Sequence, residues 1–313
     1  MGQRIFEPSL DVNLRALLAF FGGNIMKLFR IRGNPYDVHA FFTRIVDEMV
    51  THRERNGVER ADMLNLLIKL KNEGFVPPDA HGEHADKGNG PTNGVSKESR
   101  TKLTQKEIAA QVFVFFLAGF ETTSTTTSFA LFELAKHPDV QEKVLQEIDA
   151  TLRKYNGQVT YEAIMDMPYM EMVVQETLRM YPAVPFLTRE AMVRRQLPLT
   201  DVLLDKGTRL MIPVNALHYD PQYWDQPKRF DPLRFTEEAK KARTGMVYMP
   251  FGDGPRICIG MRLGLVQVKM ALITILSRAK VSLPADMPKE ARMNPRCIIP
   301  TPIDGIRLNV SAR

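Results

Sequence analysis

Apolar residues recur along most of this chain at the three-and-four spacing of amphipathic helices. The pattern predicts helices over residues 35–55, 61–71, 104–137, 138–155, 161–167 and 169–180, and one more after Gly260. Short apolar stretches at 202–204 and 210–213 flank a turn at Asp205-Lys206-Gly207 and predict strands, and more short strands are expected within 281–313. The expected fold class is mainly α with small β-sheets (α+β).

The helix predicted over 104–137 is the most informative element. Thr104 and Glu107 have the spacing of a capping box, which predicts its start, and Pro138 opens the next helix. Residues 112–117 are apolar on every side of the helix, so we expect this part to be buried in the core.

An unusual run follows inside the same helix, with the sequence Ala118-Gly119-Phe120-Glu121-Thr122 and more Thr and Ser up to position 127. Glycine is a poor residue for a helix interior, hydroxyl side chains compete for backbone carbonyls, and a buried glutamate needs a partner. One interpretation is a tolerated helix bend. The other is a cofactor that packs against the small residues, with the acid and the alcohols lining the same cavity.

Glycines crowd the loop around Cys258, one of two cysteines in the chain. Gly252, Gly254 and Gly260 tolerate positive φ and close backbone approach. Cys258 lies just before or within the first turn of a predicted helix, where free N–H groups and the helix dipole stabilise a thiolate. A lone cysteine is most often a small buried hydrophobe, but a thiolate here could serve as a nucleophile or a metal ligand.

Two other kinds of site are excluded by the spacing of this loop. A dinucleotide-binding fingerprint would need a glycine at position 257, which is Ile257. A zinc site would need clustered cysteine or histidine ligands, and Cys297 is distant and isolated.

Composition is that of an ordinary globular protein, with 44% hydrophobic and 25% charged residues among 313. Two cysteines fit a reducing compartment. The net charge of +6 indicates a solvated surface, or attraction to anionic lipid or an acidic protein partner. The patterns of nucleic-acid binding proteins are missing, so no nucleic-acid partner is expected.

No signal peptide and no stretch of the roughly 20 apolar residues that cross a bilayer are found, so the chain by itself is expected to be soluble. Residues 1–33 carry apolar patches, which favour two short helices on the core over a segment at a lipid interface. Residues 74–102 are rich in Gly, Pro and polar residues and predict a flexible loop.

The sequence of residues 251–260, Phe-Gly-Asp-Gly-Pro-Arg-Ile-Cys-Ile-Gly, resembles the haem-binding signature of the cytochrome P450 family. The resemblance implies that Cys258 binds the metal, as the axial thiolate ligand of the iron in haem b (iron protoporphyrin IX). Phe251, Gly252 and Gly260 would belong to the same cofactor-binding loop. Arg256 and Arg189 resemble the residues that bind the haem propionates, a task suited to the bidentate guanidinium.

The run from Ala118 to Thr122 resembles the part of the family's long central helix that lies over the distal face of the haem. By this resemblance Ala118 and Gly119 are cofactor-binding, and Ala118 also forms part of the wall of the substrate pocket. Glu121 and Thr122 would be the catalytic pair that hydrogen-bonds to dioxygen and relays protons.

A third motif follows in the order that the family shows. Glu176 and Arg179, together with Arg234 from a proline-rich meander, resemble a buried salt-bridged triad that locks the meander onto the core and positions the cysteine loop. Such a triad is costly unless it is fully paired, so we expect it to specify one arrangement rather than add net stability.

Together the three motifs imply a haem-thiolate monooxygenase. It would insert one oxygen atom of O₂ into small apolar substrates (xenobiotics, hormones or lipids), with electrons from NADPH through NADPH-cytochrome P450 reductase and with cytochrome b5 as a second partner. The detail of the motifs, with the Arg-Glu-Arg-Asn-Gly stretch at 53–57, resembles the microsomal insect detoxification branch. That implies membrane association at the cytosolic face of the endoplasmic reticulum.

The resemblance covers the whole chain but begins well inside the family, so we expect an N-terminally truncated single domain without its membrane anchor. Residues 1–180 would form a helix-rich part, 181–264 the sheet, meander and cysteine loop, and 265–313 a C-terminal helix and strands. Two alternatives stay open. One is a truncated, inactive fragment that binds haem or a partner, and the other is a haem-thiolate isomerase or dehydratase, against which Glu121 and Thr122 argue.

Overall fold

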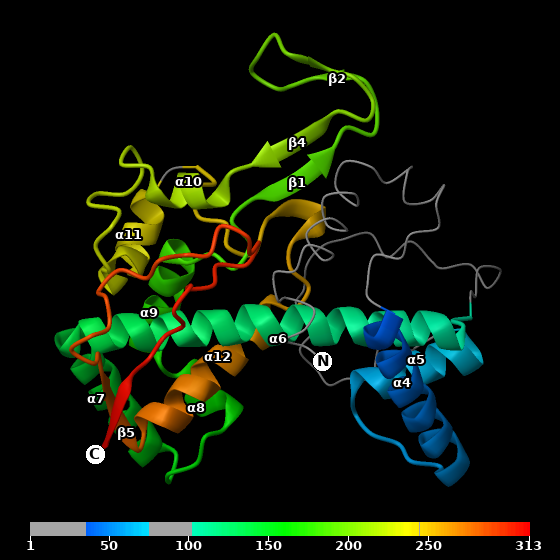
Figure 1. Cartoon of the computed structure of the whole chain (residues 1–313), viewed down its shortest axis with the longest axis horizontal. Helices are drawn as coiled ribbons and strands as arrows, with labels where there is room; N and C mark the ends of the chain where they lie inside the picture. The colour runs from blue at the N-terminus through cyan, green and yellow to red at the C-terminus, as the bar shows by residue number, and fades with distance from the viewer. Residues whose placement is uncertain (1–35, 75–101, 244) are drawn as a thin grey trace. The chain divides into compact units, whose positions relative to one another are not determined.

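The computed structural model describes residues 36–74, 102–243 and 245–313 (Figure 1). The segment 1–33 and almost all of the predicted loop at 74–102 lie outside the described residues. The described part is mainly helical with three two-stranded sheets, which agrees with the predicted α+β class. The chain divides into two compact units, residues 1–118 and residues 119–313.

The described residues of the first unit form two helices and the start of a third. These are α4 (Tyr36–Asn56), α5 (Met63–Glu73) and the beginning of α6 (Gln105–Lys136). Asp62 caps α5 by accepting a hydrogen bond from the Asn65 N–H, and two hydrogen bonds of 2.6 and 2.7 Å from Arg53 tie it to α4. The apolar core of this unit consists of Val46, Val50, Leu64, Leu67, Ile68, Ile108 and Ala109.

The capping box at the start of α6 is confirmed. The Thr104 N–H donates to Glu107 Oε2 at 2.7 Å, and the Glu107 N–H donates to Thr104 Oγ1 at 3.3 Å. α6 then runs for 32 residues to Lys136, as predicted.

The predicted burial of residues 112–117 is wrong. Val114, Phe115 and Phe116 have exposed fractions of 54%, 39% and 42%. A run of apolar residues shows that a helix surface is more stable when it is buried. Burial also requires another element that covers that surface. The buried residues of α6 lie mostly further along, at Phe129, Ala130, Phe132 and Leu134.

The expectation that no stretch could cross a bilayer also needs correction. Among the described residues, α6 is long and apolar enough to do so by length and composition. These two criteria do not separate a spanning helix from the core helix of a soluble protein. The C-terminal part of α6 belongs to the main core, whereas only 11% of the 18-residue apolar window is buried.

The main core lies in the second unit, around α7 (Pro138–Lys154), α8 (Tyr161–Met165), α9 (Pro168–Met180) and α12 (Met261–Leu276). α7 and α9 each begin with proline, whose fixed φ suits the first helical position and whose missing N–H would have no partner there. α12 contacts α7, α8 and α9. Fully buried members of this core are Phe129, Val144, Leu145, Ile148, Met170, Val173, Leu272 and Ile273.

Three antiparallel strand pairs complete the sheets of the described residues (Figure 1). β1 (Leu187–Glu190) pairs with β4 (Arg209–Ile212), β2 (Arg195–Gln196) with β3 (Leu203–Leu204), and β5 (Ala279–Ser282) with β6 (Asn309–Ala312). The strands predicted at 202–204 and 210–213 are confirmed. β1 and β2 were not predicted, because their sequences Leu-Thr-Arg-Glu and Arg-Gln lack a run of apolar residues.

The meander between β4 and the cysteine loop contains short helices that the sequence pattern did not predict. They are α10 (Val214–Tyr219), the 3₁₀ turn η2 (Pro232–Phe235) and α11 (Glu237–Ala242). Trp224, Phe235 and Val247 form a small separate core beneath them. The Arg243 guanidinium lies 4.3 Å from the centroid of the Trp224 ring and covers that core.

Candidate functional site

The cysteine loop is a tight turn with few conformational choices. Gly252 and Gly254 have φ angles of +72° and +73°. In this left-handed region the backbone of a residue with a side chain would be strained. At Gly252 an added Cβ would also lie 3.7 Å from Leu187 Cδ1 and 3.8 Å from the Arg256 carbonyl oxygen. The predicted role of these glycines in shaping the loop therefore has a local physical basis.

Hydrogen bonds hold Cys258 within this turn. A short 3₁₀ helix, η3 (Gly254–Arg256), follows Asp253, and the Cys258 N–H donates to the carbonyl of Phe251 at 2.9 Å. Phe251 itself packs against the main core. Cys258 lies three residues before the first residue of α12, as the sequence predicted.

Cys258 is exposed, and so are three apolar side chains close to it in the chain. Ile257, Ile259 and Leu263 have exposed fractions of 45%, 89% and 58%. A soft sulfur donor set in an apolar surface fits a flat apolar cofactor that carries a metal ion. Gly260 allows close approach there, since an added Cβ would lie 4.0 Å from Cys258 Sγ.

Both predicted propionate-binding arginines lie at this loop. Arg256 ends η3, two residues before Cys258. Arg189 lies on β1, and its NH2 group donates to the Asp253 carbonyl at 3.4 Å, which joins the sheet to the cysteine loop. Two cations beside an apolar surface fit a cofactor that is apolar in the centre and anionic at its edge.

The predicted residues of α6 differ in exposure. Ala118 and Gly119 are exposed, whereas Glu121 and Thr122 are half-buried. An added Cβ at Gly119 would find no atom within 4 Å, so space is open above this point of the helix. The helix is not interrupted there, and the hydroxyls of Thr126 and Thr127 donate to the carbonyls of Thr122 and Thr123 at 2.8 Å each.

Glu121 lines a small cavity of about 230 Å³. Its lining is mixed, with the hydroxyl residues Ser124, Thr125, Ser128 and Thr301 beside apolar side chains that include Phe129 and Ile306. Burial raises the pKa of the Glu121 carboxyl. A carboxyl group with a raised pKa beside several hydroxyls can hold and exchange a proton.

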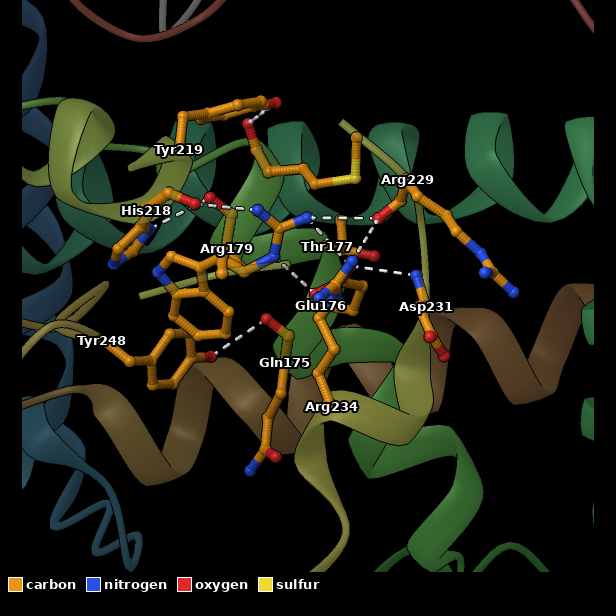
Figure 2. Close-up of polar contacts among 12 residues, drawn as sticks. Gln175, Glu176, Thr177, Arg179, His218, Tyr219, Arg229, Asp231, Arg234 and Tyr248 are labelled. Carbon is orange, nitrogen blue, oxygen red and sulfur yellow. Dashed lines mark hydrogen bonds and ion pairs between the residues drawn. The ribbon is translucent and has the colours of Figure 1, made fainter. Parts of the chain in front are cut away.

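The predicted triad is brought together in the core, as Figure 2 shows. Arg179 Nε and NH2 donate to the two carboxylate oxygens of Glu176 at 2.7 and 2.9 Å, and neither side chain has any exposed surface. Arg234 Nε lies 3.4 Å from Glu176 Oε1. The Asp231 N–H donates to the same oxygen at 2.9 Å, so the carboxylate holds both helix α9 and the meander.

One buried residue of this region was not predicted. His218 on α10 is fully buried, its Nδ1 lies 3.0 Å from the Arg179 carbonyl oxygen, and its Nε2 accepts from the Met249 N–H at 3.1 Å. Burial lowers the pKa of His218 to about 4. The available signal was its spacing of four from Val214, which is also fully buried and marks the inner face of α10.

A second buried carboxylate joins the end of α6 to the end of α9, and it was also missed. Glu133 is fully buried and accepts hydrogen bonds from the Tyr181 hydroxyl at 2.6 Å and from Lys136 at 2.7 Å. Burial, with the Glu133 charge, raises the pKa of Tyr181 above its ordinary value. This pair lies within the second unit, and Tyr181 is the residue that caps the C-terminus of α9.

Known proteins of similar sequence carry the family name that the motifs indicate. A family model described as Cytochrome P450 matches residues 6–310. The chain is 39% identical to cytochrome P450 6a2 of Drosophila melanogaster over 311 residues, which is 99% of this chain and 58% of that protein. It is 36% identical to cytochrome P450 6k1 of Blattella germanica over 310 residues, 98% of this chain and 58% of the relative.

A third relative matches almost the whole chain. Cytochrome P450 6B2 of Helicoverpa armigera is 35% identical over 309 residues, 99% of this chain and 58% of the relative. The chain thus spans 58% of the length of these curated relatives. With the family model matched almost from end to end, and with the thiol loop and the Glu176–Arg179–Arg234 cluster in place, this chain belongs to the cytochrome P450 family.

Proposed function

We propose that this chain carries the haem-thiolate core of a monooxygenase. The observation that carries the proposal is the exposed thiol of Cys258, held by the Phe251 carbonyl in a rigid apolar loop of a chain that belongs to this family. When bound, haem b supplies the chemistry that activates dioxygen, and thiolate ligation favours O–O cleavage. Arg189 and Arg256 bind the propionates, and Phe251, Gly252 and Gly260 shape the loop.

Side chains of this protein transfer the protons that the reaction needs. In the proposed function Glu121 takes up protons through its cavity, and the Thr122 hydroxyl donates and accepts at the next position. The raised pKa of Glu121 supports this role, because a group that delivers protons must hold one near working pH. Ala118 and Gly119 leave room for the cofactor and substrate.

The substrate and partners follow from the same family membership. A small apolar molecule, such as a xenobiotic, a hormone or a lipid, is the proposed substrate. Electrons come from NADPH through NADPH-cytochrome P450 reductase, with cytochrome b5 as a second donor, at the cytosolic face of the endoplasmic reticulum. A net charge of +6 supports docking to an acidic partner protein or to an anionic membrane.

The thiolate assignment is tested by the carbon-monoxide difference spectrum of the reduced chain, expressed at full length and supplied with haem. The wild-type chain should show the thiolate-type band, and Cys258→Ala should lose it entirely because no other thiolate is placed in the loop. Cys297→Ala is the matched control, since Cys297 is the second cysteine and lies 39 residues after Cys258 in the chain.

A band that persists in Cys258→Ala and disappears in Cys297→Ala would refute the assignment of Cys258. A thiolate-type band in wild type without any turnover in the presence of reductase would instead support the haem-binding fragment and not the monooxygenase.

The proton relay is tested by Thr122→Ala. Loss of a positioned proton-transfer group lowers the rate of the step that it catalyses by about 100-fold. We expect haem content to stay constant while product per NADPH falls and hydrogen peroxide rises. Thr127→Ala is the control, because Thr127 donates to a helix carbonyl further along α6. Equal peroxide yields in the two variants would remove Thr122 from the mechanism.

A further inference from the structure

We infer that His218 is a positioning residue for the Cys258 loop. It links the buried ion pair of α9 to Met249, two residues before that loop begins. The inference rests on the proposed function only in the identity of Cys258 as the ligand. Neither the sequence motifs nor the comparisons assign a role to His218.

The first step of the link is a reciprocal pair of hydrogen bonds between His218 and Arg179 (Figure 2). Arg179 NH1 donates to the His218 carbonyl at 2.8 Å, and His218 Nδ1 lies 3.0 Å from the Arg179 carbonyl. Arg179 is itself held by both oxygens of Glu176. The backbone and the ring of His218 are therefore both fixed to the end of α9.

The second step passes to the cysteine loop. The Met249 N–H donates to His218 Nε2 at 3.1 Å, so Nε2 carries no proton and Nδ1 carries the one that reaches Arg179. Burial favours this neutral ring, and the positive charges of Arg179 and Arg243 act in the same direction. The Tyr248 ring stacks on His218 at 5.4 Å between centroids and keeps the ring in its plane.

Two backbone hydrogen bonds complete the path to the thiol. The Gly252 N–H donates to the Met249 carbonyl at 3.0 Å, and the Cys258 N–H donates to the Phe251 carbonyl at 2.9 Å. The first bond closes a turn over residues 249–252, and Phe251, the acceptor of the second bond, lies inside that turn. A shift of Met249 would therefore move the turn that holds Cys258.

A second hydrogen bond also attaches this segment to α9, and its effect must be distinguished from that of His218. The Tyr248 hydroxyl donates to the Gln175 carbonyl at 3.0 Å, which also ties this segment to α9. That bond precedes Met249 in the chain and provides no acceptor for the Met249 N–H, so it cannot replace the histidine in setting the turn.

The test compares His218→Asn with His218→Gln in the full-length chain, with and without added haem. The Asn amide reaches the position of Nδ1 and keeps the bond to Arg179. The Gln amide reaches the position of Nε2 and keeps an acceptor for Met249. Loss of one such bond should speed amide hydrogen exchange at Met249 about tenfold in the Asn variant, while the Gln variant keeps the wild-type rate.

The spectrum gives a second readout of the same variants. The thiolate-type fraction of the carbon-monoxide difference spectrum should fall in His218→Asn and recover in His218→Gln. His52→Asn is the control, since the His52 ring bonds to Asn56 within α4 of the first unit.

A measurement on the wild-type chain keeps the inference testable even where the Asn variant does not fold. Nitrogen-15 NMR of the His218 ring should show the Nδ1–H tautomer with a bare Nε2. The Nε2–H tautomer would overturn the inference, because that nitrogen could not accept from Met249.

The two proposals fail separately. Equal exchange rates at Met249 in wild type and both variants would overturn the positioning role and leave the thiolate assignment, which is read from the wild-type spectrum alone. The opposite result is a wild-type chain that lacks a thiolate-type band but whose amide exchange at Met249 depends on His218. It would refute Cys258 as the ligand and support the role of His218 in positioning the loop.

Discussion

A buried histidine makes stability depend on pH at the scale of one residue. Burial lowers the pKa of His218 to about 4, whereas in the unfolded chain it titrates at its ordinary value of 6.5. Between these values the unfolded state takes up a proton and the native state does not. The free energy of unfolding should therefore decrease as the pH falls from 6.5 to about 4, by about 3 kcal/mol in total.

The measurement is urea unfolding at several pH values in that window, for wild type and His218→Gln. A glutamine side chain does not titrate, so the variant should lose less stability than wild type as the pH falls. The groups that face the ring, Arg179, Arg243 and Tyr248, are present in both proteins, and their effects cancel in the comparison. Parallel pH profiles would show that His218 is not buried as a neutral ring.

At the scale of elements, one carboxylate joins α9 to the meander. Glu176 accepts hydrogen bonds from Arg179 and from the Asp231 N–H, and it forms an ion pair with Arg234. Burial raises the pKa of Glu176, and the hydrogen bonds from Arg179 act in the opposite direction. Glu176→Gln would leave the buried Arg179 without its counter-charge and should cost about 3 kcal/mol.

The matched control for this change is Glu142→Gln. Glu142 pairs with Lys280 at 3.0 Å, but both side chains are half exposed, so the loss of this pair should leave the urea midpoint unchanged. Equal midpoints for Glu176→Gln and wild type would show that the triad does not join α9 to the meander.

Some helices and strands can be predicted from their own local sequence, and others cannot. α6, α7 and α12 were predicted because capping boxes, first-turn prolines and apolar spacing act within one element. β1 was not predicted, because its polar sequence forms a strand only through pairing with β4. α10 is equally dependent on its surroundings, since a six-residue helix is stabilised by the buried side chains of Val214 and His218 rather than by its own hydrogen bonds.

For the whole molecule, exposed apolar side chains are the clearest departure from expectation. Those at 114–116 of the first unit lie on α6. Those at Ile257, Ile259 and Leu263 of the second unit lie within five residues of Cys258 in the chain. Large exposed apolar areas mark surfaces that other molecules cover. Around Cys258 the proposed cofactor accounts for this exposure.

The sequence by itself determined the family, the order of its motifs and the type of nearly every long helix, because these depend on residue identity and short-range spacing. It also pointed to Cys258 and to the Glu176–Arg179 pair, three residues apart on one helix face. Only the tertiary structure decided what lies against what. His218 meets Arg179 across 39 residues and Met249 across 31, and such contacts follow from packing, which no local pattern encodes.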